Sequence, residues 1–129
     1  MPAIERVILI DDNESDNVYH EIMIRRSGFA GEIVVFENGV DGLHYLETTD
    51  LDRPTYIFLD INMPMMDGFE VAERAAPLLE NHRAVIVVML TSSASPHDRE
   101  RAGKLEIVHG FITKPLRVDA IRDLLDDSF

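Results

Sequence analysis

Five short runs of apolar, mostly β-branched residues constrain the fold of this chain more than any other feature. Each run is continuous, whereas a strand with one face in water would alternate apolar and polar residues. The runs cover residues 4–10, 32–37, 55–60, 84–91 and 107–113. They therefore predict parallel strands that are covered on both faces.

The segments between and after these runs carry helical signals. Val18 and Ile22 are spaced to share one helix face, and Ser95-Pro96 is a typical helix start. The predicted helices cover residues 13–27, a short segment capped by Asn38, 68–79, a segment that begins at 95–96, and 116–126. Because strands alternate with helices five times, we predict an α/β fold with a five-stranded parallel sheet and helices on both faces.

Two of these helices contain residues that disfavour helix formation. Pro77 lies inside the third helical pattern, where proline removes a backbone donor and clashes with the preceding turn. We therefore expect this helix to kink or to end near Ala76. The fourth helix has few apolar residues and includes Gly103, so we expect it to be marginal.

Length and composition exclude several classes of protein. The 129 residues are enough for one domain, and a hydrophobic fraction of 46% allows a core. The lack of cysteine excludes disulfides, thiol nucleophiles and thiolate metal sites, and the net charge of −12 disfavours direct binding of nucleic acid or anionic lipid. With no apolar run of transmembrane length and no signal peptide, we expect one cytoplasmic domain over residues 1–129.

Polar residues lie where several of the predicted strands end. Asp11 and Asp12 follow the first strand, Asp60 ends the third and Thr91 ends the fourth. Lys114 follows the fifth strand directly. Because the carboxyl ends of parallel strands lie along one edge of a sheet, we expect these side chains to meet in one crevice.

The residue types gathered there suit phosphoryl chemistry. Carboxylates that lie close together repel one another unless a cation is present, and hard oxygen ligands suit Mg²⁺. A carboxylate such as Asp60 can attack phosphorus as a nucleophile. Lys114 and the hydroxyl of Thr91 can stabilise the charge on the transferred oxygens. Asp11 and Asp12 could instead cap the first helix, but two successive acids exceed that need.

Four motifs in this order and spacing resemble the receiver domain of two-component response regulators. They are LIDDNESDN (9–17), FLDINMPMMDGFE (58–70), MLTSSAS (89–95) and GFITKPL (110–116), and the resemblance covers essentially the whole chain. It implies a flavodoxin-like sheet with the strand order 2-1-3-4-5. The segments DDNESDNVYHE and LTSSASPHD also resemble small phytochrome-associated responders.

The resemblance implies a metal and acceptor role for the acidic positions. Asp60 matches the residue that accepts the phosphoryl group. Asp12 matches the acid that binds Mg²⁺ directly, and Asp11 matches the one that acts largely through a water. Asn62 matches the position whose backbone carbonyl binds the metal.

It also implies a role for residues on the last two strands. Thr91 matches the switch hydroxyl that turns toward the phosphoryl group, and Phe111 matches the switch aromatic residue. Lys114 matches the lysine that pairs with the phosphoryl group, and Pro115 matches a proline that follows a cis peptide bond.

Two other functions remain open on the residues alone. A Mg²⁺-dependent aspartyl-phosphate phosphatase of the haloacid dehalogenase type would also end a strand on a nucleophilic aspartate. That enzyme needs a second aspartate two residues later, where this chain has Asn62. An adaptor that has lost phosphorylation is the other option, and the intact set of site residues disfavours it.

The resemblance thus implies a receiver without an output domain, which is a phospho-accepting switch rather than a conventional enzyme. A histidine kinase or phosphotransfer protein would donate the phosphoryl group, and slow self-dephosphorylation would remove it. The output would be a contact with an unidentified protein, made by the face of the fourth helix, fifth strand and fifth helix. A homodimer through the same face is a further option.

Overall fold

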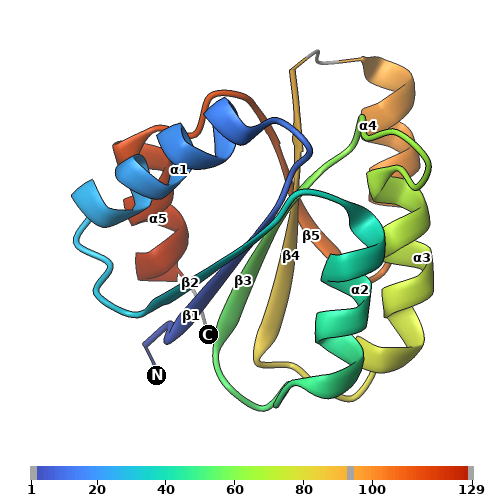
Figure 1. The fold of residues 1–129 in the computed structure, drawn as a ribbon, viewed down its shortest axis with the longest axis horizontal. Helices are drawn as coiled ribbons and strands as arrows, with labels where there is room; N and C mark the ends of the chain where they lie inside the picture. The colour runs from blue at the N-terminus through green and yellow to red at the C-terminus, as the bar shows by residue number, and fades with distance from the viewer. Residues whose placement is uncertain (1–2, 93–94, 128–129) are drawn as a thin grey trace.

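The computed structural model describes residues 3–92 and 95–127, so residues 93–94 of the third motif lie outside it. A parallel sheet of five strands in the order β2-β1-β3-β4-β5 forms its centre, as Figure 1 shows. The strands are β1 (Arg6–Ile10), β2 (Glu32–Phe36), β3 (Thr55–Asp60), β4 (Val85–Thr91) and β5 (Val108–Thr113). The predicted fold class and strand order are both confirmed.

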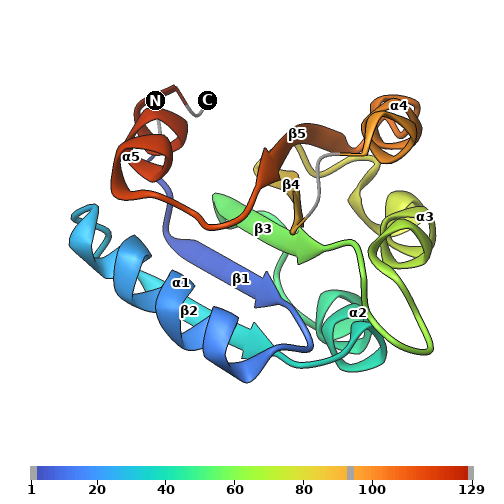
Figure 2. The same cartoon turned by 90° about the horizontal axis from the view of Figure 1, so that it is seen from above.

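Helices cover both faces of this sheet. They are α1 (Glu14–Arg26), α2 (Gly39–Thr48), α3 (Gly68–Leu79), α4 (Pro96–Gly103) and α5 (Val118–Asp127). Figure 2 shows α1 and α5 on one face and α2, α3 and α4 on the other. Two hydrophobic clusters fill the spaces between the sheet and these two helical layers. The sheet is thereby covered on both sides, which explains why its strands are continuously apolar in sequence.

Short polar side chains fix where four of the helices begin. Asn13, Asn38, Asp67 and Ser95 each accept a hydrogen bond from the backbone N–H three residues later. Such a cap satisfies one of the donors that a helix start leaves unpaired. The start predicted at Ser95-Pro96 is therefore confirmed, with Pro96 in the first turn of α4.

Pro77 was expected to kink α3 or to end it near Ala76, and the structure contradicts the second of these outcomes. The helix continues through Pro77 to Leu79. Pro77 lacks the backbone N–H that would donate to the carbonyl of the preceding turn, and burial of Ala75 and Leu79 holds the last turn on the sheet despite this loss. Other boundaries differ less, and β1 begins at Arg6 rather than at residue 4.

The face shared by Val18 and Ile22 points into solvent, contrary to its apolar character. Both side chains are exposed, whereas α1 buries Asn17 and His20 together with Met23 and Ile24 toward the sheet. Helical spacing showed that Val18 and Ile22 share a face, but it did not show that this face is the outer one. In this part of α1, buried polar residues and exposed apolar residues thus reverse the usual amphipathic pattern of a surface helix.

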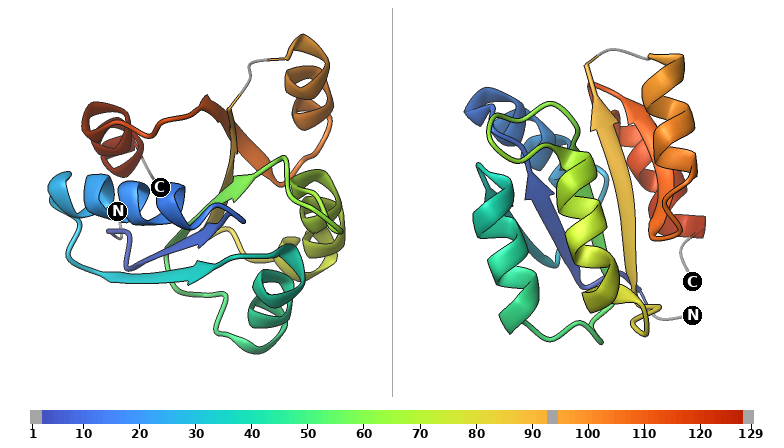
Figure 3. Two further views of the ribbon diagram at one scale, coloured as in Figure 1. Left: turned by 45° about the horizontal axis from the view of Figure 1, so that its top comes forward. Right: turned by 90° about the vertical axis from the view of Figure 1, so that its right-hand side faces the viewer.

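A buried arginine ties the amino end of the sheet to α2. Arg6 is fully buried, and its guanidinium donates to the Thr55 hydroxyl at 3.0 Å and the Thr49 hydroxyl at 2.8 Å. It also donates to the Asp50 carbonyl, 2.7 Å away, just beyond the C-terminus of α2. The negative end of the helix dipole favours a cation there. Figure 3 shows that the strands run from this end of the sheet toward its opposite end. Within the described residues, no helix has the length and apolar character needed to cross a bilayer.

Candidate phosphoryl-transfer site

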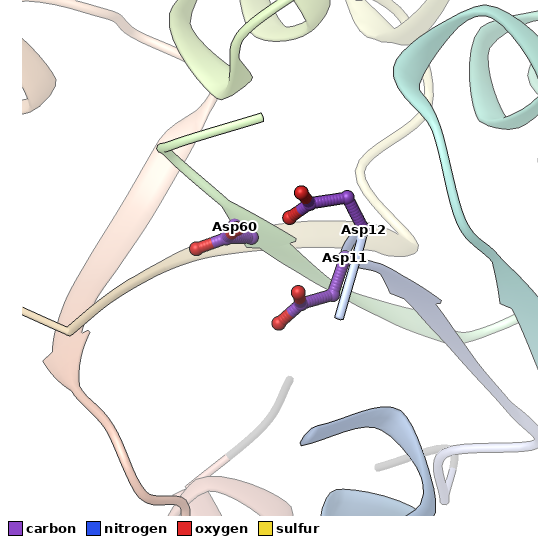
Figure 4. Close-up of side chains that lie close together, drawn as sticks. All are labelled: Asp11, Asp12 and Asp60. Carbon is purple, nitrogen blue, oxygen red and sulfur yellow. The ribbon is translucent and has the colours of Figure 1, made fainter. Parts of the chain in front are cut away.

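Three carboxylates meet at the carboxyl edge of the sheet. Asp11 and Asp12 follow β1, and Asp60 is the last residue of β3. One oxygen from each lies within 4.8 Å of the others. Figure 4 shows the three side chains converging from the ends of the two strands. Asp11 and Asp60 are buried and Asp12 is exposed, so the cluster is open to solvent on one side only.

Lys114 supplies the cation of this site. Its Nζ lies 2.7 Å from Oδ2 of Asp11 and 3.2 Å from Oδ1 of Asp60. The Lys114–Pro115 peptide bond is cis, as the resemblance implied. The backbone N–H of Lys114 donates to the Thr91 carbonyl at 2.7 Å, which holds the lysine beside the end of β4.

Hydrogen bonds from the start of α1 fix the carboxylate and carbonyl of Asp11. The backbone N–H of Asn13 donates to Oδ1 of Asp11 at 2.9 Å. The buried Asn17 donates from Nδ2 to the Asp11 carbonyl at 2.8 Å. Asn17 was not predicted as a site residue, although an amide at the second turn of a helix that follows two acids was a visible signal.

Close approach of the β3–α3 loop fixes the end of β3. The N–H of Gly68 donates to the Ile61 carbonyl at 2.9 Å. A Cβ at Gly68 would overlap the Asp60 carbonyl and lie 2.9 Å from Cα of Ile61. Only glycine therefore allows the start of α3 to close against the strand that carries Asp60.

The charges of the site shift the pKa of two of its residues. Burial, together with the field of Asp11, raises the pKa of Asp60 to about 6, although Lys114 acts in the opposite direction. Burial lowers the pKa of Lys114, but hydrogen bonds to Asp11 and Asp16 outweigh this effect and raise it. The lysine is thus a permanent cation among crowded carboxylates, one of which holds a proton more tightly than usual.

The two residues expected to switch lie on neighbouring strands. Thr91 is fully buried at the end of β4, next to Leu90, which pairs with Asp60 of β3. Phe111 is half-buried on β5 and pairs with Met89. The guanidinium carbon of Arg99 on α4 lies 4.7 Å from the centre of the Phe111 ring. Asn62, also named from the resemblance, is exposed in the loop after β3.

The donor set at this edge suits a hard divalent cation. It consists of carboxylate oxygens from Asp11, Asp12 and Asp60, with neither cysteine nor histidine among them. Asp11 and Asp60 already share the ammonium of Lys114 as a counter-charge. The acids therefore fit the metal that their pattern predicted.

Comparison with known proteins gives the same family over nearly the whole length. Residues 7–126 match the model of the response regulator receiver domain. The chemotaxis protein CheY of Halobacterium salinarum is 29% identical over 124 residues, which cover 95% of each chain. A receiver protein structure from Dyadobacter fermentans aligns with a TM-score of 0.85 and 27% identity over 95% of each chain.

A bacteriophytochrome response regulator, AtBRR, is also similar. Its structure aligns with a TM-score of 0.78 and 28% identity, covering 98% of this chain and 94% of the other. This similarity agrees with the resemblance to phytochrome-associated responders, and the family match excludes the haloacid dehalogenase alternative. The receiver model covers nearly every residue and includes both acidic motifs, so the chain belongs to the response regulator receiver domain family and is a phosphorylatable response regulator of two-component signalling.

Proposed function

We propose that Asp60 accepts a phosphoryl group from the phosphohistidine of a histidine kinase or phosphotransfer protein. The observation that carries this proposal is the contact of the Asp60 carboxylate with Lys114, at 3.2 Å, beside two further acids. An Asp60 oxygen attacks phosphorus, the bond from phosphorus to the donor's ring nitrogen breaks, and the imidazole leaves with the electron pair. Attack by water on the acyl phosphate later restores the carboxylate and releases inorganic phosphate.

The side chains around Asp60 have separable tasks in this transfer. Lys114 and Thr91 offer donors to the phosphoryl oxygens, on which negative charge must be stabilised. Asp11, Asp12, Asp60 and the backbone carbonyl of Asn62 would hold Mg²⁺. That ion, when bound, neutralises charge on the acids and the phosphoryl oxygens. The protein would thus act as a switch that slowly dephosphorylates itself, and it would not convert a substrate into a released product in repeated turnovers.

Labelling with a small phosphodonor tests the acceptor. The protein is incubated with phosphoramidate and Mg²⁺, and its intact mass is measured. We expect the addition of one phosphoryl group, which is mapped to the peptide that contains Asp60. Labelling at any other residue, or no labelling, would contradict the proposal.

The metal is tested by its effect on stability. A ligand that binds only the native state at ten times its dissociation constant stabilises that state by about 1.4 kcal/mol. We expect Mg²⁺ to raise the melting temperature of the parent accordingly, and Asp12→Ala to lose this response. Asp119→Ala, which removes an exposed acid on α5, is the matched control. A full Mg²⁺ response in Asp12→Ala would place the metal elsewhere.

The output of the phosphorylated form is proposed to be a protein contact in the cytoplasm. The receiver domain would pass the signal on through contacts of its own surface. The face formed by α4, β5 and α5 carries Phe111 and would make the contact with a downstream protein or a second copy. Gel filtration with and without beryllofluoride separates these options, because the isolated protein increases in size only if a second copy of the chain is the partner.

A further inference from the structure

A fourth carboxylate, Asp16, reaches the lysine of the site. It lies in the first turn of α1, and Lys114 Nζ donates to its Oδ2 at 3.0 Å. An acid three residues after a helix cap often accepts a hydrogen bond from the backbone N–H of the cap. Here the N–H of the cap, Asn13, donates to Asp11 instead. The Asp16 carboxylate is therefore available to Lys114, which lies 98 residues away in sequence.

The ammonium of Lys114 is already shared among three carboxylates. An ammonium has three N–H donors, and the three carboxylates of Asp11, Asp16 and Asp60 lie 2.7, 3.0 and 3.2 Å from Nζ. The lysine side chain is only 12% exposed, so water has little access to it. A phosphoryl group on Asp60 must therefore compete with these carboxylates for the ammonium of Lys114.

Asp16 is the carboxylate that loses the lysine at the lowest cost. The side chains of Asp11 and Asp60 are 3% and 5% exposed, whereas that of Asp16 is 38% exposed. A buried carboxylate that loses its ion-pair partner remains poorly solvated, but water can replace the lysine at Asp16. Of the three carboxylates, Asp16 is therefore the one that an incoming phosphoryl group can most easily displace from Lys114.

We propose that Asp16 is a positioning residue that holds Lys114 in the resting site and competes with the Asp60 phosphoryl group for it. This inference rests on the proposed function, in which Asp60 is the acceptor. Asp16 then destabilises the phosphorylated state by the free energy of its own ion pair with Lys114. Replacing Asp16 with asparagine removes the charge and nearly preserves the shape, so it should strengthen the binding of a phosphoryl mimic.

A plain helix-stabilising role makes a different prediction. Any acid in the first turn of a helix interacts favourably with the helix dipole, whatever else it contacts. Glu14 lies in the same turn and is exposed, and among the described residues no ion pair joins it to Lys114. Glu14→Gln is therefore the matched control, because it removes the same charge from the same turn without touching the lysine.

The experiment measures beryllofluoride binding in the presence of Mg²⁺ by ¹⁹F NMR for the parent, Asp16→Asn and Glu14→Gln. We expect Asp16→Asn to bind roughly two- to five-fold more tightly than the parent, which lies within the range measured for exposed ion pairs. Glu14→Gln should differ from the parent by less than about twofold. The difference should persist at about 0.5 M salt, where the screening length is about 4 Å and long-range field effects are suppressed.

The ammonium signal of Lys114 in ¹H–¹⁵N spectra provides a second readout. Held by three carboxylates, its protons should exchange slowly with water in the parent and faster in Asp16→Asn. Equal affinity in Asp16→Asn and Glu14→Gln, or weaker binding by Asp16→Asn, would overturn the competition proposed here. A parent that binds no beryllofluoride would overturn the proposed function itself, and the two failures are thus distinct.

Discussion

Asp60→Asn is expected to leave the protein unlabelled by any phosphodonor. The substitution keeps the size of the side chain but removes the oxygen nucleophile, and the neighbouring acids cannot replace it. Asp11 directs its carboxylate at Lys114 and the N–H of Asn13, and Asp12 lies on the exposed side of the cluster. The measurement is intact mass after incubation with phosphoramidate and Mg²⁺. Asp119→Asn on α5 is the control and should be labelled as fully as the parent.

The same substitution should stabilise the metal-free protein. The pKa of Asp60, raised to about 6 from 3.8, means that ionisation of this carboxyl opposes folding. A pKa difference of this size corresponds to on the order of 2 to 3 kcal/mol, and an asparagine side chain at this position would not ionise at all. The gain should therefore be seen in denaturant titrations at neutral pH without Mg²⁺.

The raised pKa of Asp60 also determines how the stability gain of Asp60→Asn depends on pH. Below the unfolded pKa of about 4, Asp60 is protonated in both states, so variant and parent should have similar stability. Between about 4 and about 6 the folded parent binds more protons than the unfolded chain, and its stability falls as the pH rises. The advantage of Asp60→Asn should grow across this window and stay constant above it. An advantage that is largest at low pH would contradict this account.

The sequence predicted the sheet well because its signal is simple. Five continuous apolar runs each became a strand, and strand ends in a parallel sheet must share an edge. That rule alone placed Asp11, Asp12, Asp60 and Lys114 together. Residues that belong to a strand end or follow it directly inherit their position from the sheet, so their proximity could be predicted without side-chain geometry.

The errors concern helices, whose position around their own axis depends on tertiary contacts. Val18 and Ile22 share a face, but the burial of Asn17 and His20 turned that face to solvent. The ion pair of Asp16 with Lys114 was missed for the same reason. An acid in a first helical turn is ordinarily explained by the helix dipole, and only the structure shows that its carboxylate reaches the lysine that follows β5.

The end of α3 shows a further limit of local signals. Pro77 was expected to kink the helix or to end it near Ala76, but the helix continues to Leu79 despite the missing backbone donor. Packing of the apolar face of α3 against the sheet outweighs that cost. The helix-breaking cost of a single residue thus has to be compared with the stabilisation from burying the helix face, and the extent of that burial cannot be obtained from the sequence.

Thr91→Ala is expected to separate phosphate acceptance from its readout. Asp60, Lys114 and the acids stay in place in this variant, so labelling should continue. The buried Thr91 lies between Asp60 on β3 and Phe111 on β5, in a sheet where the three strands are neighbours. Its hydroxyl can donate to a phosphoryl oxygen, and the movement would leave space that the half-buried Phe111 can enter. We therefore expect phosphorylation to shift the population of two Phe111 positions rather than to create a new state.

Amide chemical shifts with and without beryllofluoride measure this coupling. In the parent we expect changes near Asp60 and across residues 95–125, where α4, β5 and α5 lie. Some of the largest chemical-shift changes should come from loss of the contact between Arg99 and Phe111, whose guanidinium carbon and ring centre lie 4.7 Å apart in the resting protein. In Thr91→Ala the changes near Asp60 should remain and those across residues 95–125 should be lost. Thr91→Ser keeps the hydroxyl and should behave as the parent does, because the coupling depends on the donor. If Thr91→Ala showed the full parental pattern, another residue would have to link Asp60 to β5.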